Sequence, residues 1–323
     1  MKSMAKTCDL RTAYAETLVR LMERDQRIVV LDADLCRSTM TTLVEQRIPE
    51  RFIEMGIAEQ NMVATAAGLA LEGQIPFVNS FAVFLCGRAY DQIRQAIAIA
   101  NLNVKLVGSS AGLSDFGDGA THQSVEDMSL MRSIPNMTVI SPSDARDVEQ
   151  ILPLIVEHQG PVYLRLARGQ LPIAEADLAP CDLAGVRRIR DGREAVVFAT
   201  GSMVAPAVDA SVMLETRGIS TRVVNVSTVK PISAPLIVAE TQGMSGVVTA
   251  EEHSVIGGLG CAITSVLRGS RLPIECVGIP DRFGTSAENY AVLMEHYGLT
   301  PNAIAEAVSN VLQKRTAQDQ VAV

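Results

Sequence analysis

The chain contains no tryptophan, and aromatic residues make up only 4% of its 323 positions. Aliphatic side chains must therefore build the core, and a hydrophobic content of 48% is enough for a large one. Positive charge is also scarce, because the formal net charge is −8. This balance argues against nucleic acid or an anionic membrane as a partner, although a few arginines can still bind phosphate groups locally.

Metal and export signals are missing as well. The six cysteines form no Cys-x-x-Cys pair, and no cysteine and histidine cluster has the spacing of zinc ligands. We therefore expect reduced thiols and no metal site on this chain. No apolar run reaches the length that spans a membrane, and the N-terminal residues lack the apolar segment of a signal peptide. The expected location is the cytoplasm.

Strand and helix signals alternate along the chain. Short apolar runs that are typical of buried strands lie at 27–32, 51–55, 75–79, 104–108, 137–140 and 162–166, with helix-like segments such as 9–24 and 88–100 between them. Glycine, proline and acidic residues interrupt the pattern, and a second alternating unit follows. The sequence predicts an α/β fold with a mainly parallel sheet in a first domain (1–170), a linker (171–192) and a smaller α/β domain (193–323).

Five residues of interest come where predicted strands of the first unit end. In open parallel sheets, ligands bind outside the carboxyl ends of the strands. One site built from these loops is therefore expected, and its first candidates are Asp34, Glu59, Phe81, Ser110 and Arg168.

Glu59 is the most informative of these residues. It opens a run, Val63 to Leu71, that is small and apolar on all sides and hence typical of a buried helix. An acid in the first turn of such a helix is costly without a partner. Two interpretations stay open: a functional carboxylate or a buried salt bridge.

Two other segments carry candidate chemistry. Phe81 and Phe84 follow a strand and form either ordinary core or an aromatic platform for a flat heterocycle. The loop 115–123 places Asp118 and His122 where they could contact a substrate oxygen, although a capped turn is the plainer interpretation. Its Gly-Asp-Gly triplet resembles a magnesium-diphosphate motif, but Asn136 comes too early to complete that motif.

Taken together, the motifs of residues 6–313 resemble a transketolase, specifically the C-terminal half found as a separate subunit in split enzymes. The resemblance is carried by five segments of the first unit and two of the second: Gly-Ile-Ala-Glu59-Gln, Ser-Phe81-Ala-Val-Phe84, Gly-Asp118-Gly-Ala-Thr-His122-Gln, Ser-Ile-Pro-Asn-Met137, Arg-Leu-Ala-Arg168-Gly, Val-Lys-Pro231 and Glu252-His-Ser-Val-Ile-Gly-Gly-Leu-Gly260.

The resemblance implies a pyrimidine-binding domain followed by a transketolase C-terminal domain. It also implies that thiamine diphosphate binds between this chain and a separate subunit. That second chain would carry the diphosphate-binding domain and hold the Mg²⁺ or Ca²⁺ ion, in an expected α2β2 heterotetramer. The implied reaction transfers a two-carbon ketol unit from a ketose phosphate to an aldose or aldose phosphate.

Residue roles follow from the same resemblance. Glu59 would hydrogen-bond the cofactor ring at N1′, Phe81 and Phe84 would stack on the ring, and Asp34 would lie near the cofactor. His122 would hydrogen-bond the donor sugar and assist proton transfer, and Asp118 would read a substrate hydroxyl.

Phosphate recognition is where the chain departs from the family. Arg11, Ser38 and Arg168 stand at three of the family's phosphate-binding positions, and a guanidinium pair suits a phosphate or sulfonate group. Ser110 stands where the family has a histidine. We therefore expect a non-standard substrate, such as a branched or modified sugar phosphate.

Alternatives from within and outside this chemistry stay open at this point. The β-subunit of a 2-oxoacid dehydrogenase has the same two-domain plan and the same glutamate, and deoxyxylulose-phosphate synthases share the Ala-Glu-Gln core. A non-catalytic assembly subunit is the alternative outside enzymes.

Overall fold

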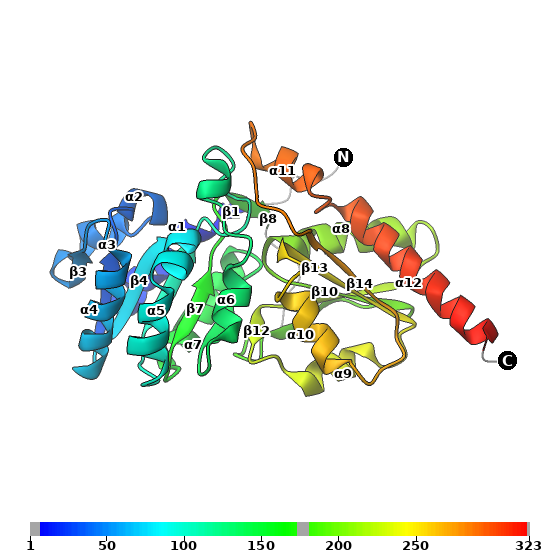
Figure 1. The fold of residues 1–323 in the computed structure, drawn as a ribbon, viewed down its shortest axis with the longest axis horizontal. Coiled ribbons are helices and arrows are strands. Elements are labelled where there is room, and N and C mark those ends of the chain that lie inside the picture. The colour runs from blue at the N-terminus through cyan, green and yellow to red at the C-terminus, as the bar shows by residue number, and fades with distance from the viewer. Residues whose placement is uncertain (1–6, 173–180, 322–323) are drawn as a thin grey trace.

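The computed structural model describes residues 7–172 and 181–321, which form two α/β domains that lie side by side (Figure 1). The first domain is built on a seven-stranded sheet of order β12-β6-β7-β5-β4-β2-β3. Its strands are β2 (Ile28–Asp32), β3 (Phe52–Glu54), β4 (Ile75–Phe81), β5 (Lys105–Ser109), β6 (Thr138–Ile140), β7 (Val162–Arg165) and β12 (Thr228–Lys230). All neighbours except β12 and β6 run parallel.

Helices cover both faces of this sheet, which explains why β2, β4 and β5 are buried along their whole length. One face packs on α1 (Leu10–Met22), α3 (Thr42–Arg47) and α7 (Ala145–Glu157). The other packs on α4 (Glu59–Leu71), η2 (Phe84–Arg88), α5 (Tyr90–Gln92), η3 (Ile93–Ala98) and α6 (Asp127–Ser133). Short helical turns α2 (Cys36–Thr39), η1 (Pro49–Arg51) and η4 (Gly119–Thr121) lie in the loops.

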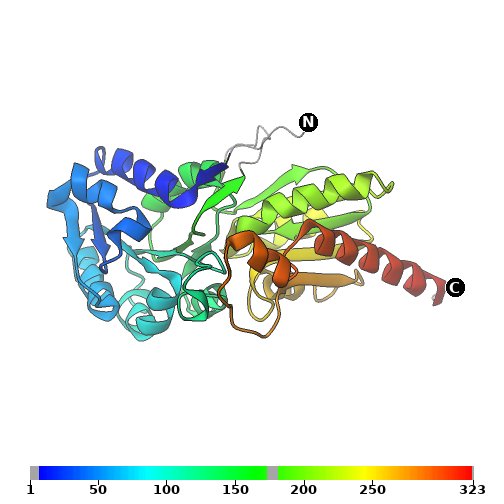
Figure 2. The same cartoon turned by 90° about the horizontal axis from the view of Figure 1, so that it is seen from above.

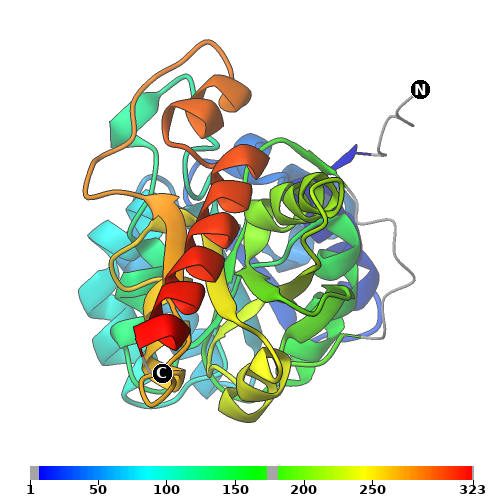
Figure 3. The ribbon, with the colours of Figure 1, turned by 90° about the vertical axis from the view of Figure 1, so that its right-hand side faces the viewer.

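The second domain has a five-stranded sheet of order β14-β13-β10-β11-β9. Its strands are β9 (Val186–Arg190), β10 (Ala195–Ala199), β11 (Thr221–Val226), β13 (Gly246–Ser254) and β14 (Ile274–Ile279). After the turn η5 (Gly201–Met203), α8 (Val204–Glu215) packs with α12 (Pro301–Val321) on one face, as Figures 2 and 3 show. Helices α9 (Ala234–Thr241) and α10 (Leu259–Val266) cover the other face, and α11 (Tyr290–His296) precedes α12.

Two connections bind the domains together beyond simple contact. Strand β12 belongs by sequence to the second unit, yet it pairs antiparallel with β6 at the edge of the first sheet. One hydrophobic cluster also runs through both domains and includes Leu31 and Val139 of the first sheet with Phe198 and Val226 of the second. The described residues therefore form one continuous structure.

The predicted fold class is confirmed: a mainly parallel α/β domain is followed by a second α/β domain. The domain boundaries stay a prediction. Of the predicted linker, residues 173–180 lie outside the described residues, and β9 falls within the range as an edge strand of the second sheet. No helix in the described part of the chain is both long and apolar enough to cross a membrane.

Candidate active site

The carboxyl edge of the first sheet carries the candidate residues. Asp34 follows β2, Glu59 follows β3, Phe81 ends β4, Ser110 follows β5 and Arg168 follows β7. Because these five strands run parallel, their ends meet at one edge, as the sequence led us to expect.

Glu59 is the first residue of α4, and its side chain is only 1% exposed. Its Oε2 accepts a hydrogen bond of 2.6 Å from a terminal nitrogen of Arg88, and the Ser80 hydroxyl lies 3.5 Å from Oε1. The Arg88 side chain is 45% exposed. A salt bridge is therefore present, but it has one buried and one open partner.

The two phenylalanines and His122 form an aromatic group beside this pair. Phe81 and Phe84 are stacked, with ring centroids 5.9 Å apart and an interplanar angle of 16°. His122 meets the Phe84 ring edge-on at 5.2 Å. The guanidinium of Arg88 lies over the Phe84 ring, 5.0 Å from its centroid. The structure thus brings Glu59, Phe81, Phe84 and His122 together, and Arg88 joins the carboxylate to the rings.

Sequence reasoning missed Arg88, which it treated only as the start of a helix at 88–100. That helix begins earlier, and two of its stretches, η2 and η3, are π-helical. Such turns are rare and are frequent at functional sites. Here the turn of η2 carries both Phe84 and Arg88, and the Gln60 side-chain amide donates to the Arg88 carbonyl at 3.1 Å. The signal for Arg88 in the sequence was its position four residues after Phe84, which places the two side chains within one helical turn of each other.

The predicted anion-binding arginines lie at the ends of a two-stranded ribbon that sequence analysis did not find. Strands β1 (Thr7–Asp9) and β8 (Gln170–Pro172) pair antiparallel, with Asp9 opposite Gln170. This pairing brings the segments that carry Arg11 and Arg168 to the same end of the ribbon.

Each of these arginines already has a carboxylate partner. Arg11 pairs with Asp9 at 2.7 Å and donates to the Ser38 carbonyl at 2.7 Å. Arg168 pairs with Asp115 at 3.0 Å, and its backbone N–H donates to the Ser114 hydroxyl. The guanidinium groups are therefore held in place by the protein.

The second domain holds the loop that carries Asp115, Asp118 and His122. Glu252, which is buried in β13, accepts a 2.7 Å hydrogen bond from the backbone N–H of Leu113. Gly112 lies so close to Glu252 that a Cβ atom at this position would collide with the Glu252 carboxyl group. Ser202 and Tyr290 of the second domain donate to the other carboxylate oxygen. Burial raises the pKa of Glu252.

Gln123 makes the second link from this loop to the C-terminal domain. Its side-chain amide donates to the carbonyls of Leu113, Asp115 and Thr285. A signal for the Glu252 link was present in the sequence, because Glu251, Glu252 and His253 interrupt an otherwise apolar strand and all three are buried.

Three predicted residues lie apart from the aromatic group. The side chains of Asp34 and Asp118 are exposed, and within the described residues no hydrogen bond or ring contact joins them to it. Ser110 is fully buried with a φ of 53°, and its hydroxyl has no hydrogen-bond partner among the described residues. Substrate contact by these three side chains stays a prediction.

Asp32 is a buried acid at this edge that sequence reasoning passed over. It accepts hydrogen bonds from the Leu35 backbone and from the hydroxyls of Thr39 and Thr41, all within 2.7–2.8 Å. Burial raises its pKa. These bonds fix the loop that carries Asp34 and Ser38, so the role of Asp32 is to shape the loop.

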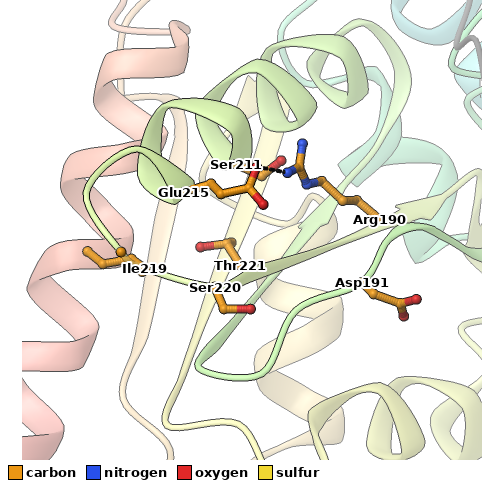
Figure 4. Close-up of a pocket in the computed structure, with 8 residues that line it drawn as sticks. Arg190, Asp191, Ser211, Glu215, Ile219, Ser220 and Thr221 are labelled. Carbon is orange, nitrogen blue, oxygen red and sulfur yellow. Dashed lines mark hydrogen bonds and ion pairs between the residues drawn. The ribbon is translucent and has the colours of Figure 1, made fainter.

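A separate pocket of about 170 Å³ lies in the second domain, between the end of β9, α8 and the start of β11 (Figure 4). Its lining includes the ion pair of Arg190 with Glu215, and none of the predicted site residues. Within residues 7–172 and 181–321, no group of three or more histidine, cysteine or acidic side chains could hold a metal ion.

Comparison with known proteins agrees with this architecture. Residues 6–174 match the model of the transketolase pyrimidine-binding domain, and residues 184–304 match that of the transketolase C-terminal domain. The chain is 40% identical to a 6-deoxy-6-sulfo-D-fructose transketolase subunit of Clostridium sp. strain MSTE9, over 95% of both chains. It is 33% identical to one of the subunits of an apulose-4-phosphate transketolase from Phocaeicola vulgatus, over 94% of this chain and 97% of that one.

A solved structure described as a split gene transketolase, inactive β4 tetramer, superposes with a TM-score of 0.86 at 41% identity, covering 95% of this chain and 99% of that chain. The chain belongs to the transketolase family. Within the family it is similar, over nearly its whole length, to the subunits of split transketolases that carry these two domains. Membership implies dependence on thiamine diphosphate.

Proposed function

We propose that this chain is the subunit of a two-chain transketolase that binds the heterocyclic ring of thiamine diphosphate. The complex transfers a two-carbon ketol unit from a ketose phosphate to an aldose or aldose phosphate. The observation that carries the proposal is the grouping of a buried carboxylate with a stacked aromatic pair and a histidine. Glu59, Phe81, Phe84 and His122 come from three separate loops of the sheet edge, yet they lie side by side.

The residues fit the heterocyclic end of thiamine diphosphate. Phe84 is partly exposed and offers a flat apolar surface, and the Glu59 carboxylate beside it is an acceptor for a ring N–H. We assign Glu59 to the ring nitrogen N1′, Phe81 and Phe84 to the ring faces, and Asp34 to the neighbourhood of the cofactor. When bound, the cofactor would supply the nucleophilic carbon that ketol transfer needs.

The other residues act on the sugar. His122 is half-buried beside Phe84, where it can hydrogen-bond the carbonyl or hydroxyl oxygen of the donor sugar and exchange a proton with it. Asp118 is placed to read a hydroxyl from the same loop. Arg11, Ser38 and Arg168 are assigned to the anionic end of the substrate, because two fixed guanidinium groups suit bidentate binding of phosphate or sulfonate.

A partner chain completes the site in this proposal. It carries the diphosphate-binding domain and the Mg²⁺ or Ca²⁺ ion, and the two chains assemble as α2β2. The solved relative described as an inactive β4 tetramer supports this, because that assembly of β chains is inactive. We place the reaction in the cytoplasm, where charged sugar phosphates are retained.

The substrate proposed is a modified or branched sugar phosphate rather than the common pentose and hexose phosphates. Two relatives named for non-standard sugars support it: one for 6-deoxy-6-sulfo-D-fructose, which carries a sulfonate in place of a phosphate, and one for apulose 4-phosphate. Ser110 supports it as well, because by its resemblance to the family this chain has a small buried hydroxyl where other transketolases have a phosphate-binding histidine. The test is a kinetic panel in which ribose 5-phosphate and xylulose 5-phosphate should not give the highest kcat/KM.

The experiment that tests the main proposal is Glu59→Gln in the complex of this chain with its partner. Ketol transfer should fall by about two orders of magnitude or more, because a neutral amide can still accept a hydrogen bond but cannot exchange a proton with the ring nitrogen. Arg94→Gln, an exposed substitution in η3, is the matched control and should leave turnover unchanged. Unchanged turnover in Glu59→Gln would favour a non-catalytic assembly role, and decarboxylation with acyl transfer to a lipoyl group would favour a 2-oxoacid dehydrogenase.

A further inference from the structure

Arg88 makes two contacts with one guanidinium group. Its guanidinium donates a 2.6 Å hydrogen bond to the buried Glu59 carboxylate, and it lies over the Phe84 ring at 5.0 Å from the centroid. A guanidinium is flat, delocalised and rich in N–H donors. A flat nitrogen heterocycle that stacks on Phe84 and donates to Glu59 would make the same two contacts. Both groups cannot occupy this place at once.

The surroundings of Arg88 allow it to leave. Its side chain is 45% exposed while that of Glu59 is 1% exposed, so the pair is open on the arginine side only. The preceding residue is Gly87, around whose Cα there is open space. The backbone of Arg88 stays anchored, because the Gln60 amide holds its carbonyl. The side chain can therefore swing outward without moving the helix.

We propose that Arg88 is a displaceable substitute for the cofactor ring, which keeps the Glu59 carboxylate paired and oriented until the ring replaces it. The inference rests on the proposed function, since it concerns the same site, and it adds a residue that no motif assigned. Its physical basis is that a buried carboxylate with no partner is costly, whereas one with an exchangeable partner is stable in both states.

The inference has a measurable consequence for binding. For a ring that must displace Arg88, the apparent dissociation constant is the intrinsic constant divided by the fraction of time that Arg88 is away from Glu59. Removing the guanidinium should therefore tighten binding of the cofactor, even though it removes a favourable contact from the free protein. A permanent structural ion pair predicts the opposite, because Glu59 would lose a partner that it needs in every state.

The experiment is titration of thiamine diphosphate, with Mg²⁺, into the assembled complex carrying Arg88→Gln, followed by calorimetry. We expect the apparent dissociation constant to fall by about threefold to tenfold relative to the parent complex. Arg94→Gln, which changes an exposed arginine in the next π-helical stretch η3, is the matched control and should leave the constant unchanged. Arg88→Lys keeps the charge but not the flat group, and its dissociation constant should lie between those of the parent and Arg88→Gln. It serves as the test variant if Arg88→Gln does not fold.

The outcomes separate this inference from the proposed function. An unchanged or weaker affinity in Arg88→Gln, with normal binding by the parent, overturns the role of Arg88 alone. A parent complex that binds no cofactor overturns both. As a second readout, modification of Arg88 by phenylglyoxal should be faster in the cofactor-bound complex than in the empty one, and equal rates would contradict displacement.

Discussion

Asp127 and Glu59 are two of the buried carboxylates of the first domain that pair with an arginine, and their pairs differ in one respect. Asp127 pairs with Arg165 at 2.8 Å, and both side chains are almost fully enclosed. Glu59 pairs with Arg88 at 2.6 Å, but the arginine is close to half exposed. The N···O distance is similar in the two pairs. What distinguishes them is that water reaches the arginine in only one of them.

The enclosed pair is part of a larger network at the junction of the domains. Tyr163 donates to Asp127, and Arg165 also donates to the backbone carbonyl of Glu252. Every partner is inside the protein, so none can be exchanged without unfolding. The open pair lies at the sheet edge, where one partner can be replaced by a ligand. The comparison suggests that the first pair serves structure and the second serves binding.

The sharpest test of this contrast removes the acid of the enclosed pair. Asp127→Ala leaves the Arg165 guanidinium buried without a carboxylate, and we expect it to lower the free energy of unfolding by about 3–5 kcal/mol. Urea unfolding followed by circular dichroism measures the change. Arg88→Ala, measured in parallel, should cost clearly less than Asp127→Ala, because water can reach Glu59 from the side that the half-exposed arginine leaves. Equal losses in the two variants would remove the distinction.

Substitution of Glu252 shows whether the network also positions the loop that carries Asp115, Asp118 and His122. Glu252→Ala leaves the Leu113 N–H without its acceptor and opens a cavity, so stability should fall by about 2–4 kcal/mol. Because Leu113 precedes Ser114 and Asp115, which hold Arg168, the KM for the sugar phosphate should rise more than kcat falls. Glu252→Gln retains an acceptor oxygen and should recover most of both. A variant that loses stability but keeps its KM would show a purely structural role.

Glu251, which is buried in β13 next to Glu252, should contribute to the pH dependence of stability. Burial raises the pKa of Glu251 to about 7 from its ordinary value of 4.5. Between these values the folded state holds a proton that the unfolded state has lost, so stability falls as pH rises. From pH 5 to 7 the loss from this group should be about 2 kcal/mol. Glu251→Gln should lack this part of the profile in urea unfolding across that range, and an unchanged profile would contradict the assignment.

The smallest effect is expected at the ion pair that lines the second-domain pocket. Arg190 and Glu215 are joined at the surface, and the Glu215 side chain is largely exposed. Arg190→Ala should change the free energy of unfolding by less than about 1 kcal/mol, because solvent screens such pairs. A larger change in urea unfolding would show that exposure is a poor guide to which pairs matter in this molecule.

The fold was predictable where strands are buried on both faces. Such strands are continuous apolar runs, so β2, β4, β5 and β10 were visible in the sequence. The short strands β1, β8 and β12 were not, because their sequences, Thr-Cys-Asp, Gln-Leu-Pro and Thr-Val-Lys, contain no continuous apolar run. Their pairing depends on which distant segment lies beside them, which a single sequence does not contain.

The candidate site was predictable to a similar extent. Glu59, Phe81, Phe84 and His122 could be named because an acid, a phenylalanine pair or a histidine is conspicuous at the end of a strand. Arg88 could not, since an arginine at the start of a helix is ordinary and its two contacts depend on a π-helical turn. The polar residues around Glu252 were visible in the sequence, but the partners of Glu252 and Gln123 were not, because these links join residues more than a hundred positions apart.

Strand β12 has a consequence for how such a protein can evolve. It is encoded after the second sheet has begun, yet it closes the edge of the first sheet beside β6. A gene cut between the two domains would leave one product with a bare sheet edge and the other with a stray strand. The two domains of this chain should therefore be inherited together, because neither could be recombined alone into another enzyme without disrupting the first sheet.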